Sequence, residues 1–365
     1  MPLSDADRTA LLRFLDALLD QERARVIVPP TEPASGFWFG GGNLAEDPDG
    51  TLWLVGRYRD AGDARTGVRG GVRGRELALF RSDDRGATFT KVRGWAKDEL
   101  GAGEELLSIE GSSLRRRGDG TWELFVSSEK RRAYPGAYAA FQKDGTGVWT
   151  IDRMTGPSPD RLDAATLAPA VVGTEPGHLH VKDPVHVDLA NGGTALLISN
   201  HPLTWASSNT GLALRAAGGE GFTPVRWQLV PRGPCWDVGV TRLTDRLRVP
   251  RVGRFADGPD LSLLCYDGAE AMAPLQGDPD PPRGESCEEL GGAMWAPGDD
   301  LAAAERLTPL APRFLSPHGT RTARYVRTLS TREGIFATWQ QAQEDGSQPL
   351  VATFLERAEI ARLLA

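Results

Sequence analysis

Three acidic residues lie beside apolar or strand-forming segments, where a carboxyl group can take part in proton transfer. They are Glu110, Asp183 and Asp237. Carboxylates brought close together repel one another, so that one keeps its proton to higher pH and serves as a general acid while another serves as a base. We expect Glu110 to be the acid, Asp183 to be the base or the group that raises the pKa of the acid, and Asp237 to be the third catalytic carboxylate. A buried salt bridge is the alternative role for Glu110, and a turn before a strand is the alternative for Asp183.

Cationic, polar and aromatic residues near these carboxylates are suited to binding a polar ligand. Arginine presents planar donors that pair with carboxylates and hydroxyls, and aromatic faces stack on sugar rings. The expected binding residues are Asn43, Arg59, His180, His201, Trp236, Arg242, His318 and Arg324. Two or three convergent arginines would suit a ligand that carries a carboxylate. For Trp236, a packed position between strands fits equally well.

Residues 82–89 read Ser-Asp-Asp-Arg-Gly-Ala-Thr-Phe and match the Asp-box pattern found in sialidases and many other propellers. We expect a hairpin turn in which Ser82 and Asp84 bond backbone amides and Gly86 adopts a positive φ. The motif therefore indicates a fold and carries no information about catalysis.

The elements that would position these residues are short strands between two helices. Residues 4–25 and 355–364 have apolar side chains at helical spacing, with Ser4 as a helix N-cap. Between them, short apolar runs alternate with Gly, Pro, Asp and Asn turns, which is typical of an all-β fold. Similar strand–turn units begin at residues 43, 110, 183, 237 and 318. This recurrence predicts five blades of a propeller, whose first strands bring distant residues to one central channel.

The strand starts at Asp183-Pro184 and Glu110-Gly111 resemble those of five-bladed β-propeller glycosidases such as arabinanases, β-fructosidases and mannosyl phosphorylases. The resemblance covers residues 37–342, although the Asn-Asp-Pro-Asn-Gly run of β-fructosidases is absent. It implies an all-β, five-bladed β-propeller with short N- and C-terminal helices. The implied divisions are an N-terminal helix in residues 1–28, a catalytic propeller in 29–352 and a C-terminal helix in 353–365.

This resemblance also implies glycoside hydrolysis by carboxylates in the propeller funnel. The expected partner is a carbohydrate, including a uronate-like or furanoside sugar, and Gly111 would let the backbone approach it closely. No cofactor is expected to be required, and a structural calcium ion could lie on the propeller axis.

Three other functions fit the same residues. A sialidase-like exo-glycosidase would have six blades and a tyrosine nucleophile, for which Tyr266 and Tyr325 are candidates. A polysaccharide lyase would use His or Tyr as the base and Arg to neutralise a uronate. A non-catalytic sugar-binding propeller would keep the aromatic residues without the acid pair.

Composition narrows the classes of partner. The formal net charge of −7 argues against a nucleic-acid partner, because phosphate binding needs clustered cations. The three cysteines cannot all pair and lack metal-site spacing, so we expect reduced thiols. No signal-like N-terminus and no long apolar run is seen, which predicts a cytoplasmic protein without a membrane partner. Nothing in the sequence indicates an oligomeric state.

Overall fold

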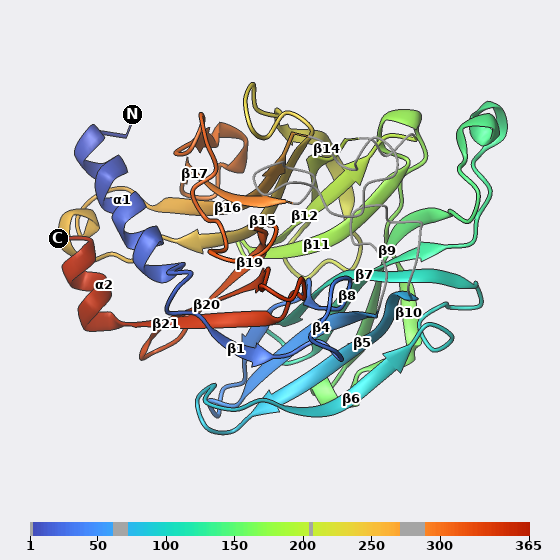
Figure 1. Ribbon diagram of the computed structural model, residues 1–365, viewed down its shortest axis with the longest axis horizontal. Coiled ribbons are helices and arrows are strands. Elements are labelled where there is room, and N and C mark those ends of the chain that lie inside the picture. Colours follow the sequence, from blue (N-terminus) through green and yellow to red (C-terminus); the bar gives the residue numbers. More distant parts are fainter. Residues whose placement is uncertain (1–2, 61–71, 204–206, 271–288) are drawn as a thin grey trace.

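The computed structural model describes residues 3–60, 72–203, 207–270 and 289–365. Within these residues the strands form five antiparallel sheets around a common centre (Figure 1). The fold is therefore the predicted five-bladed propeller and not the six-bladed alternative. Because each sheet packs its two faces against neighbouring blades, the ring buries its apolar side chains between blades.

The blades run from an inner strand to an outer strand. The first contains β2 (Trp38–Gly40), β3 (Leu44–Glu46), β4 (Leu52–Asp60), β5 (Val72–Ser82) and β6 (Thr90–Ala96). The second contains β7 (Leu106–Arg116), β8 (Trp122–Lys130), β9 (Val148–Gly156) and β10 (Asp163–Val171). The third contains β11 (His180–Asp188), β12 (Thr194–His201), β13 (Asn209–Arg215) and β14 (Thr223–Val230).

The last two blades complete the ring. The fourth contains β15 (Val240–Arg248), β16 (Leu261–Ala269), β17 (Leu290–Pro297) and β18 (Glu305–Arg306). The fifth contains β19 (Ala323–Ser330), β20 (Gly334–Gln341), β21 (Leu350–Glu356) and β1 (Arg25–Val28). Short 3-10 helices occur at Gly136–Phe141, Pro159–Arg161, Pro176–His178, Gly253–Phe255 and Leu301–Ala303.

The fifth blade joins the two ends of the chain. Strand β1 pairs antiparallel with β21, with Arg25 opposite Ala352 and Val26 opposite Val351. One sheet built from both ends closes the ring, so that the chain cannot open at this seam without breaking strand hydrogen bonds. The segment 1–28, expected to contribute a helix alone, thus also supplies a propeller strand, and the propeller strands extend past residue 352 to Glu356.

The turn at residues 82–89 helps to hold this seam. Asp84 accepts hydrogen bonds from the Thr88 amide at 2.9 Å and from the Ser82 hydroxyl at 2.7 Å, and Gly86 has a φ of 81°. Arg25 of β1 donates to the carbonyls of Ala87, at 3.0 Å, and of Gly86. The turn has the expected hydrogen bonds and connects the first blade to the fifth.

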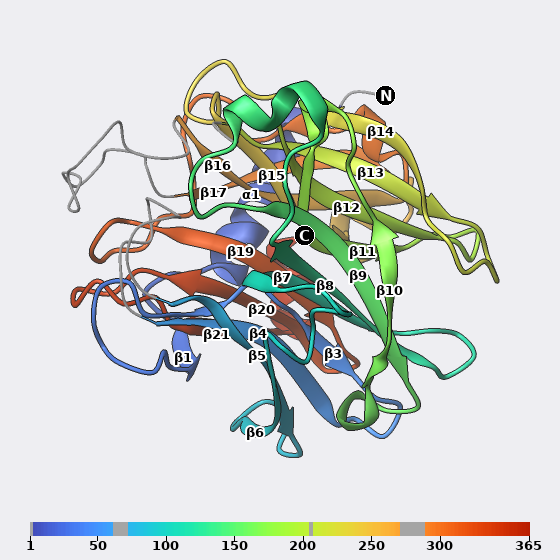
Figure 2. The ribbon, with the colours of Figure 1, turned by 90° about the vertical axis from the view of Figure 1, so that its right-hand side faces the viewer.

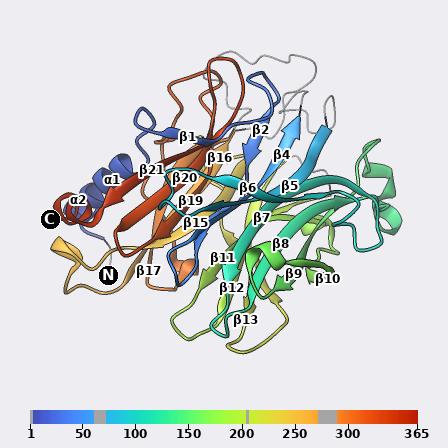
Figure 3. The ribbon, with the colours of Figure 1, turned by 90° about the horizontal axis from the view of Figure 1, so that it is seen from below.

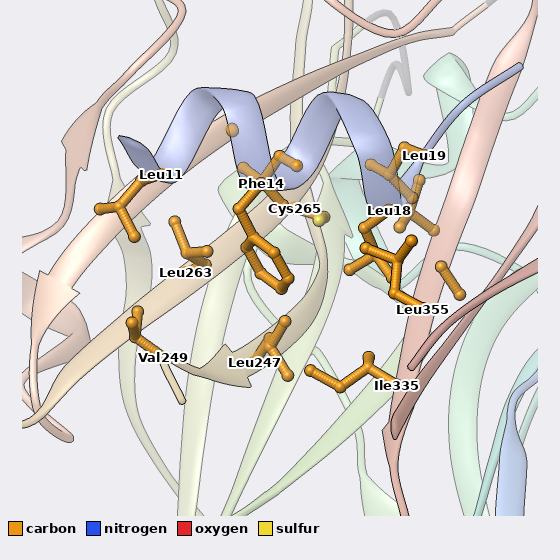
Figure 4. Packing of buried hydrophobic residues seen from close by; sticks show 14 of the residues in the cluster. Leu11, Phe14, Leu18, Leu19, Leu247, Val249, Leu263, Cys265, Ile335 and Leu355 are labelled. Carbon is orange, nitrogen blue, oxygen red and sulfur yellow. The ribbon is translucent and has the colours of Figure 1, made fainter. Parts of the chain in front are cut away.

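Two helices cover one side of the ring. The N-terminal α1 (Asp5–Leu18) has Ser4 as N-cap, as predicted, and lies beside the C-terminal α2 (Arg357–Leu363) (Figure 1). Helix α1 ends well before residue 25, because the carboxylate of Asp20 accepts backbone amides and forms a turn. Its apolar face packs against strands of the fourth and fifth blades (Figure 4).

In the second to fifth blades, the inner strands β7, β11, β15 and β19 lie around the centre of the propeller (Figure 2). The same strands are visible from below in Figure 3. Each has a shift in its pairing register with the next strand: Ile109/Ser112, Lys182/Val185, Leu243/Asp245 and Arg324/Arg327. A bulge of this kind bends a strand and re-aims a side chain. These irregularities therefore set the direction of the side chains at the centre.

No helix among the described residues is long and apolar enough to cross a bilayer. Cys235 and Cys265 are free thiols, the first exposed and the second buried. Cys287 lies outside the described residues.

Replacing Phe14 by alanine should lower the free energy of unfolding by about 3–5 kcal/mol, because this ring is fully buried between α1 and the propeller. Chemical denaturation measures the change. Thr9→Ala on the exposed face of the same helix is the control, with an expected change below about 0.5 kcal/mol. Equal losses in the two variants would contradict the packing of α1 on the blades.

Candidate active site

Charged side chains from all five blades meet near the N-terminal halves of the inner strands. We call this group the central charge cluster. Its members are the cations Arg57, Arg59, Lys182, Arg242 and Arg324 and the carboxylates Glu110, Asp183, Asp267 and Glu289. The structure thus brings together five residues that the sequence singled out, Glu110, Asp183, Arg59, Arg242 and Arg324.

Asp183 is held in this cluster by an unusual backbone. It has a φ of 51° and is buried. Its Oδ1 accepts the Gly111 amide at 3.0 Å, and a Cβ at position 111 would lie 2.5 Å from that oxygen. Glycine at 111 therefore makes room for the Asp183 carboxylate, whereas the sequence suggested room for a sugar. Burial would raise the pKa of Asp183, but Lys182, Arg242 and Arg57 outweigh it and lower the pKa to about 2.

Glu110 occupies a more open position in the cluster. Its side chain is 14% exposed. Ser108 donates to Oε1 at 2.7 Å, while Oε2 lies 3.5 Å from Nη2 of Arg57 and 3.9 Å from Nζ of Lys182. Burial would raise the pKa of Glu110, yet Lys182 and Arg57 lower it below its ordinary value. In the free protein this carboxyl group is therefore ionised at neutral pH.

Arg242 is the point at which three carboxylates meet. Its guanidinium lies 3.2 Å from Asp183, 2.7 Å from Asp267 and 3.1 Å from Glu289, and its side chain is only 2% exposed. Burial raises the pKa of Asp267 to about 6 despite Arg242. Glu289 also pairs with Arg324, and this pairing outweighs burial, so that its pKa is lowered. Without Arg242, these buried negative charges would repel one another.

Tyr325 connects two sides of the cluster. Its hydroxyl accepts a hydrogen bond from Arg57 at 3.3 Å and donates to Asp183 Oδ2 at 3.5 Å. The guanidinium carbon of Arg242 lies 4.2 Å from the centre of its ring. Tyr325 has a φ of 56°, so two residues in the left-handed region, Tyr325 and Asp183, are in contact. Such strain costs about 1–3 kcal/mol per residue and concentrates at functional sites.

Two of the predicted residues pack within the fourth blade instead. Asp237 is buried and accepts a hydrogen bond from Nε of Arg306 at 2.8 Å. Trp236 stacks on Tyr266 and donates to the carbonyl of Thr308 at 3.0 Å. Their described partners lie in the strands and loops of this blade, and neither residue is part of the central charge cluster.

Asn43 and His318 also lie apart from the cluster. The Asn43 amide bonds both the N–H and the carbonyl of Leu114, at 2.7 and 2.9 Å, and so ties the first blade to the second. It borders a cavity of about 490 Å³ lined by the opposite halves of the inner strands. His318 lies 3.2 Å from Glu344 on exposed chain before β19.

His180 and His201 lie behind Lys182, around the ring of Trp149. Both are buried; Tyr134 Oη lies 2.9 Å from His180, and His201 Nδ1 lies 3.0 Å from the carbonyl of residue 207. Burial, with a smaller effect of Lys182, lowers the pKa of His180 to about 3, and the pKa of His201 is lowered in the same way. Both imidazoles are therefore neutral and weakly basic.

The sequence analysis did not identify Asp267 and Glu289. Asp267 ends the apolar run of β16 and Glu289 directly precedes β17, so neither lies on an inner strand. The sequence feature that could have identified Asp267 is a single acidic residue near the end of a strand that is otherwise apolar and buried. Among the residues that the structure describes, no group of three His, Cys, Asp or Glu side chains is arranged to hold a metal ion.

Solved structures with the same fold include carbohydrate-active enzymes. An α-L-arabinofuranosidase from Lactobacillus brevis aligns with a TM-score of 0.59 and 12% identity over 92% of this chain and 93% of its own. A β-1,2-mannobiose phosphorylase from Listeria innocua, in complex with β-1,2-mannobiose, gives 0.57 and 13% over 93% and 96%. An enzyme from Xanthomonas citri in complex with xylotriose gives 0.53 and 10% over 95% and 93%.

The sequence itself matches no protein-family model and no curated protein. The structural likeness, at this low identity, shows the fold alone. The fold is the one seen in five-bladed propeller glycoside hydrolases, as the strand-start motifs predicted.

Replacing Arg242 by methionine should lower the free energy of unfolding by about 3–5 kcal/mol, because it leaves three buried carboxylates without their shared cation. Arg248→Met is the matched control: it lies on the same strand with a side chain that is 44% exposed, and should cost less than about 1 kcal/mol. Denaturation curves that show the Arg242 variant as stable as the wild type would contradict the described cluster.

Proposed function

We propose that this protein cleaves glycosidic bonds at the centre of its propeller, with Glu110 as the carboxyl group that transfers a proton at the reacting bond. The observation that carries the proposal is the placement of Glu110. It is partly exposed, while Ser108, Arg57 and Lys182 orient its two oxygens from the protein side. The fold supports the same class of substrate, since the named structural neighbours include an arabinofuranosidase and a mannobiose phosphorylase.

Hydrolysis of a glycoside breaks the bond between the anomeric carbon and the leaving oxygen and joins a water oxygen to that carbon. One proton moves from the water to the leaving oxygen, which requires one carboxyl group as donor and another as acceptor or nucleophile. The nearest oxygens of Glu110 and Asp183 lie 3.9 and 3.8 Å from the same Lys182 ammonium, so they are at most about 8 Å apart. Asp183 therefore lies close enough to Glu110 for its charge to change the pKa of that group.

Asp183 is better suited to tuning the site than to touching the substrate. It is buried, and its oxygens contact Gly111, Arg242 and Tyr325. Of its two expected roles, base and modulator of the acid's pKa, we assign Asp183 the second: its negative charge influences the pKa of Glu110. Glu289, whose side chain is 14% exposed and whose pKa is, against the effect of burial, lowered by Arg324 and Arg242, takes the place of Asp237, and we assign it the role of proton acceptor or nucleophile.

The buried histidines are poorly suited to serve as the base of a lyase. A lyase base must abstract a proton near neutral pH, whereas His180, with a pKa lowered to about 3, is a weak base. His201 is buried with a pKa lowered in the same direction, and His318 pairs with Glu344.

Glu110→Gln should reduce the turnover of a cleaved glycoside by a factor on the order of 10²–10⁴, the usual contribution of a proton-transfer group. The measurement is sugar release from a panel of aryl glycosides and oligosaccharides, with absorbance of unsaturated product followed in parallel. Glu105→Gln is the matched control, because this exposed residue of the same blade pairs only with Arg131 among the described residues, and its rate should stay at the wild-type value.

Retention of turnover in the Glu110 variant would remove it from the chemistry. An ultraviolet-absorbing product would identify a lyase, and ligand binding without turnover in the wild type would identify a sugar-binding module.

A further inference from the structure

The ammonium group of Lys182 is enclosed by charges but makes no hydrogen bond to any described residue. Its Nζ lies 3.8 Å from Asp183 and 3.9 Å from Glu110, longer than the roughly 2.7–2.9 Å of a charge-assisted hydrogen bond. The ring of Trp149 covers it at 5.2 Å, and the side chain is 13% exposed. The ammonium can therefore donate a hydrogen bond to a group that enters from the exposed side.

Arg57 presents a second cation to the same place. Its Nη2 lies 3.5 Å from Glu110 Oε2, again longer than a good charge-assisted hydrogen bond. Its other described partners are uncharged, namely the carbonyl of Gly40 at 3.2 Å and the hydroxyl of Tyr325 at 3.3 Å. Lys182 of the third blade and Arg57 of the first blade thus both face Oε2 of Glu110.

Several cations of the central charge cluster gather around Glu110, namely Arg57, Lys182 and Arg59. Burial lowers the pKa of Arg59 to about 10 against the opposite effect of Glu110, and the nearby cations Arg73, Arg324 and Arg57 make smaller contributions to the lowering. Buried charges without full hydrogen bonding are costly, so one additional anion would stabilise the group.

We infer that Lys182 and Arg57 bind an oxyanion carried by the substrate, a carboxylate on the sugar, so that the substrate class is a uronide or a similarly acidic glycan. The inference rests on the proposed glycosidase function and names its substrate. The shared chemistry of the site, an oxyanion recognised by an ammonium and a guanidinium, also fits free phosphate, and the experiment separates the two sources.

Binding of this anion would change Glu110. The pKa of Glu110 is set by burial, which raises it, and by Lys182 and Arg57, which lower it. A carboxylate paired with these two cations cancels much of their field, and burial then dominates. The same binding event that recognises the acidic sugar thus converts the ionised Glu110 of the free protein into a general acid.

The test compares 4-nitrophenyl uronides with the matching neutral glycosides, which differ only in the oxidation of one carbon. The wild type should favour the uronide by at least about 100-fold in kcat/KM, because a site built for a charged group discriminates strongly against its absence. Lys182→Gln should reduce this ratio at least tenfold, and Lys182→Arg should restore part of it. Lys91→Gln, an exposed lysine of the first blade paired with Glu76, should leave the ratio unchanged.

Two results would overturn the inference while leaving the proposed function intact. One is equal cleavage of uronides and neutral glycosides with the same ratio in Lys182→Gln. The other is cleavage that depends on added inorganic phosphate and yields a sugar phosphate, which would make the anion a free co-substrate.

Absence of cleavage in every arm would count against the proposed function, and a binding measurement then tests the site on its own. Free glucuronate or galacturonate should raise the melting temperature of the wild type but not that of Lys182→Gln, while glucose and galactose should not. Equal shifts in both proteins, or none, would overturn the anion site.

Discussion

The ion pairs around Arg242 are the interaction on which the centre of the propeller depends. One guanidinium, almost fully buried, faces carboxylates from the third and fourth blades. Burying several carboxylates in a small volume is unfavourable unless cations share the space. Ion pairs through Arg242 and Arg324 therefore link several charges of the cluster to one another. A cluster of this kind resembles a prepared electrostatic environment more than a framework for holding blades together.

Backbone irregularity provides the geometry that this cluster needs. Regular strands would alternate their side chains between the two faces of a blade, and few would point to the axis. The bulges in the inner strands change this direction, and Asp183 and Tyr325 adopt left-handed backbone conformations where they meet. The ring must hold these strained residues in place, and the shared sheet of β1 and β21 closes it.

Much of the fold could be predicted from the sequence, because strand–turn units recur along the chain and the two helices have clear apolar periodicity. The site was accessible only in part. Glu110 and Asp183 stand at strand starts, so a rule based on blade repetition finds them. Asp267 and Glu289 lie on or beside outer strands, which that rule does not reach. Asn43 and Asp237 also lie near strand starts, but their hydrogen bonds join neighbouring blades or strands of one blade. A polar residue near a strand start is therefore not always part of the site.

In the proposed complex, Glu110 and Lys182 face a bound acidic sugar from the centre of the propeller. A crystal structure of the Glu110→Gln variant soaked with a uronide tests it most directly. We expect the sugar carboxylate within hydrogen-bond distance of Lys182 Nζ and Arg57, with the glycosidic oxygen beside residue 110. A sugar bound elsewhere, or one that turns an uncharged hydroxyl toward Lys182 and its carboxylate toward solvent, would contradict it.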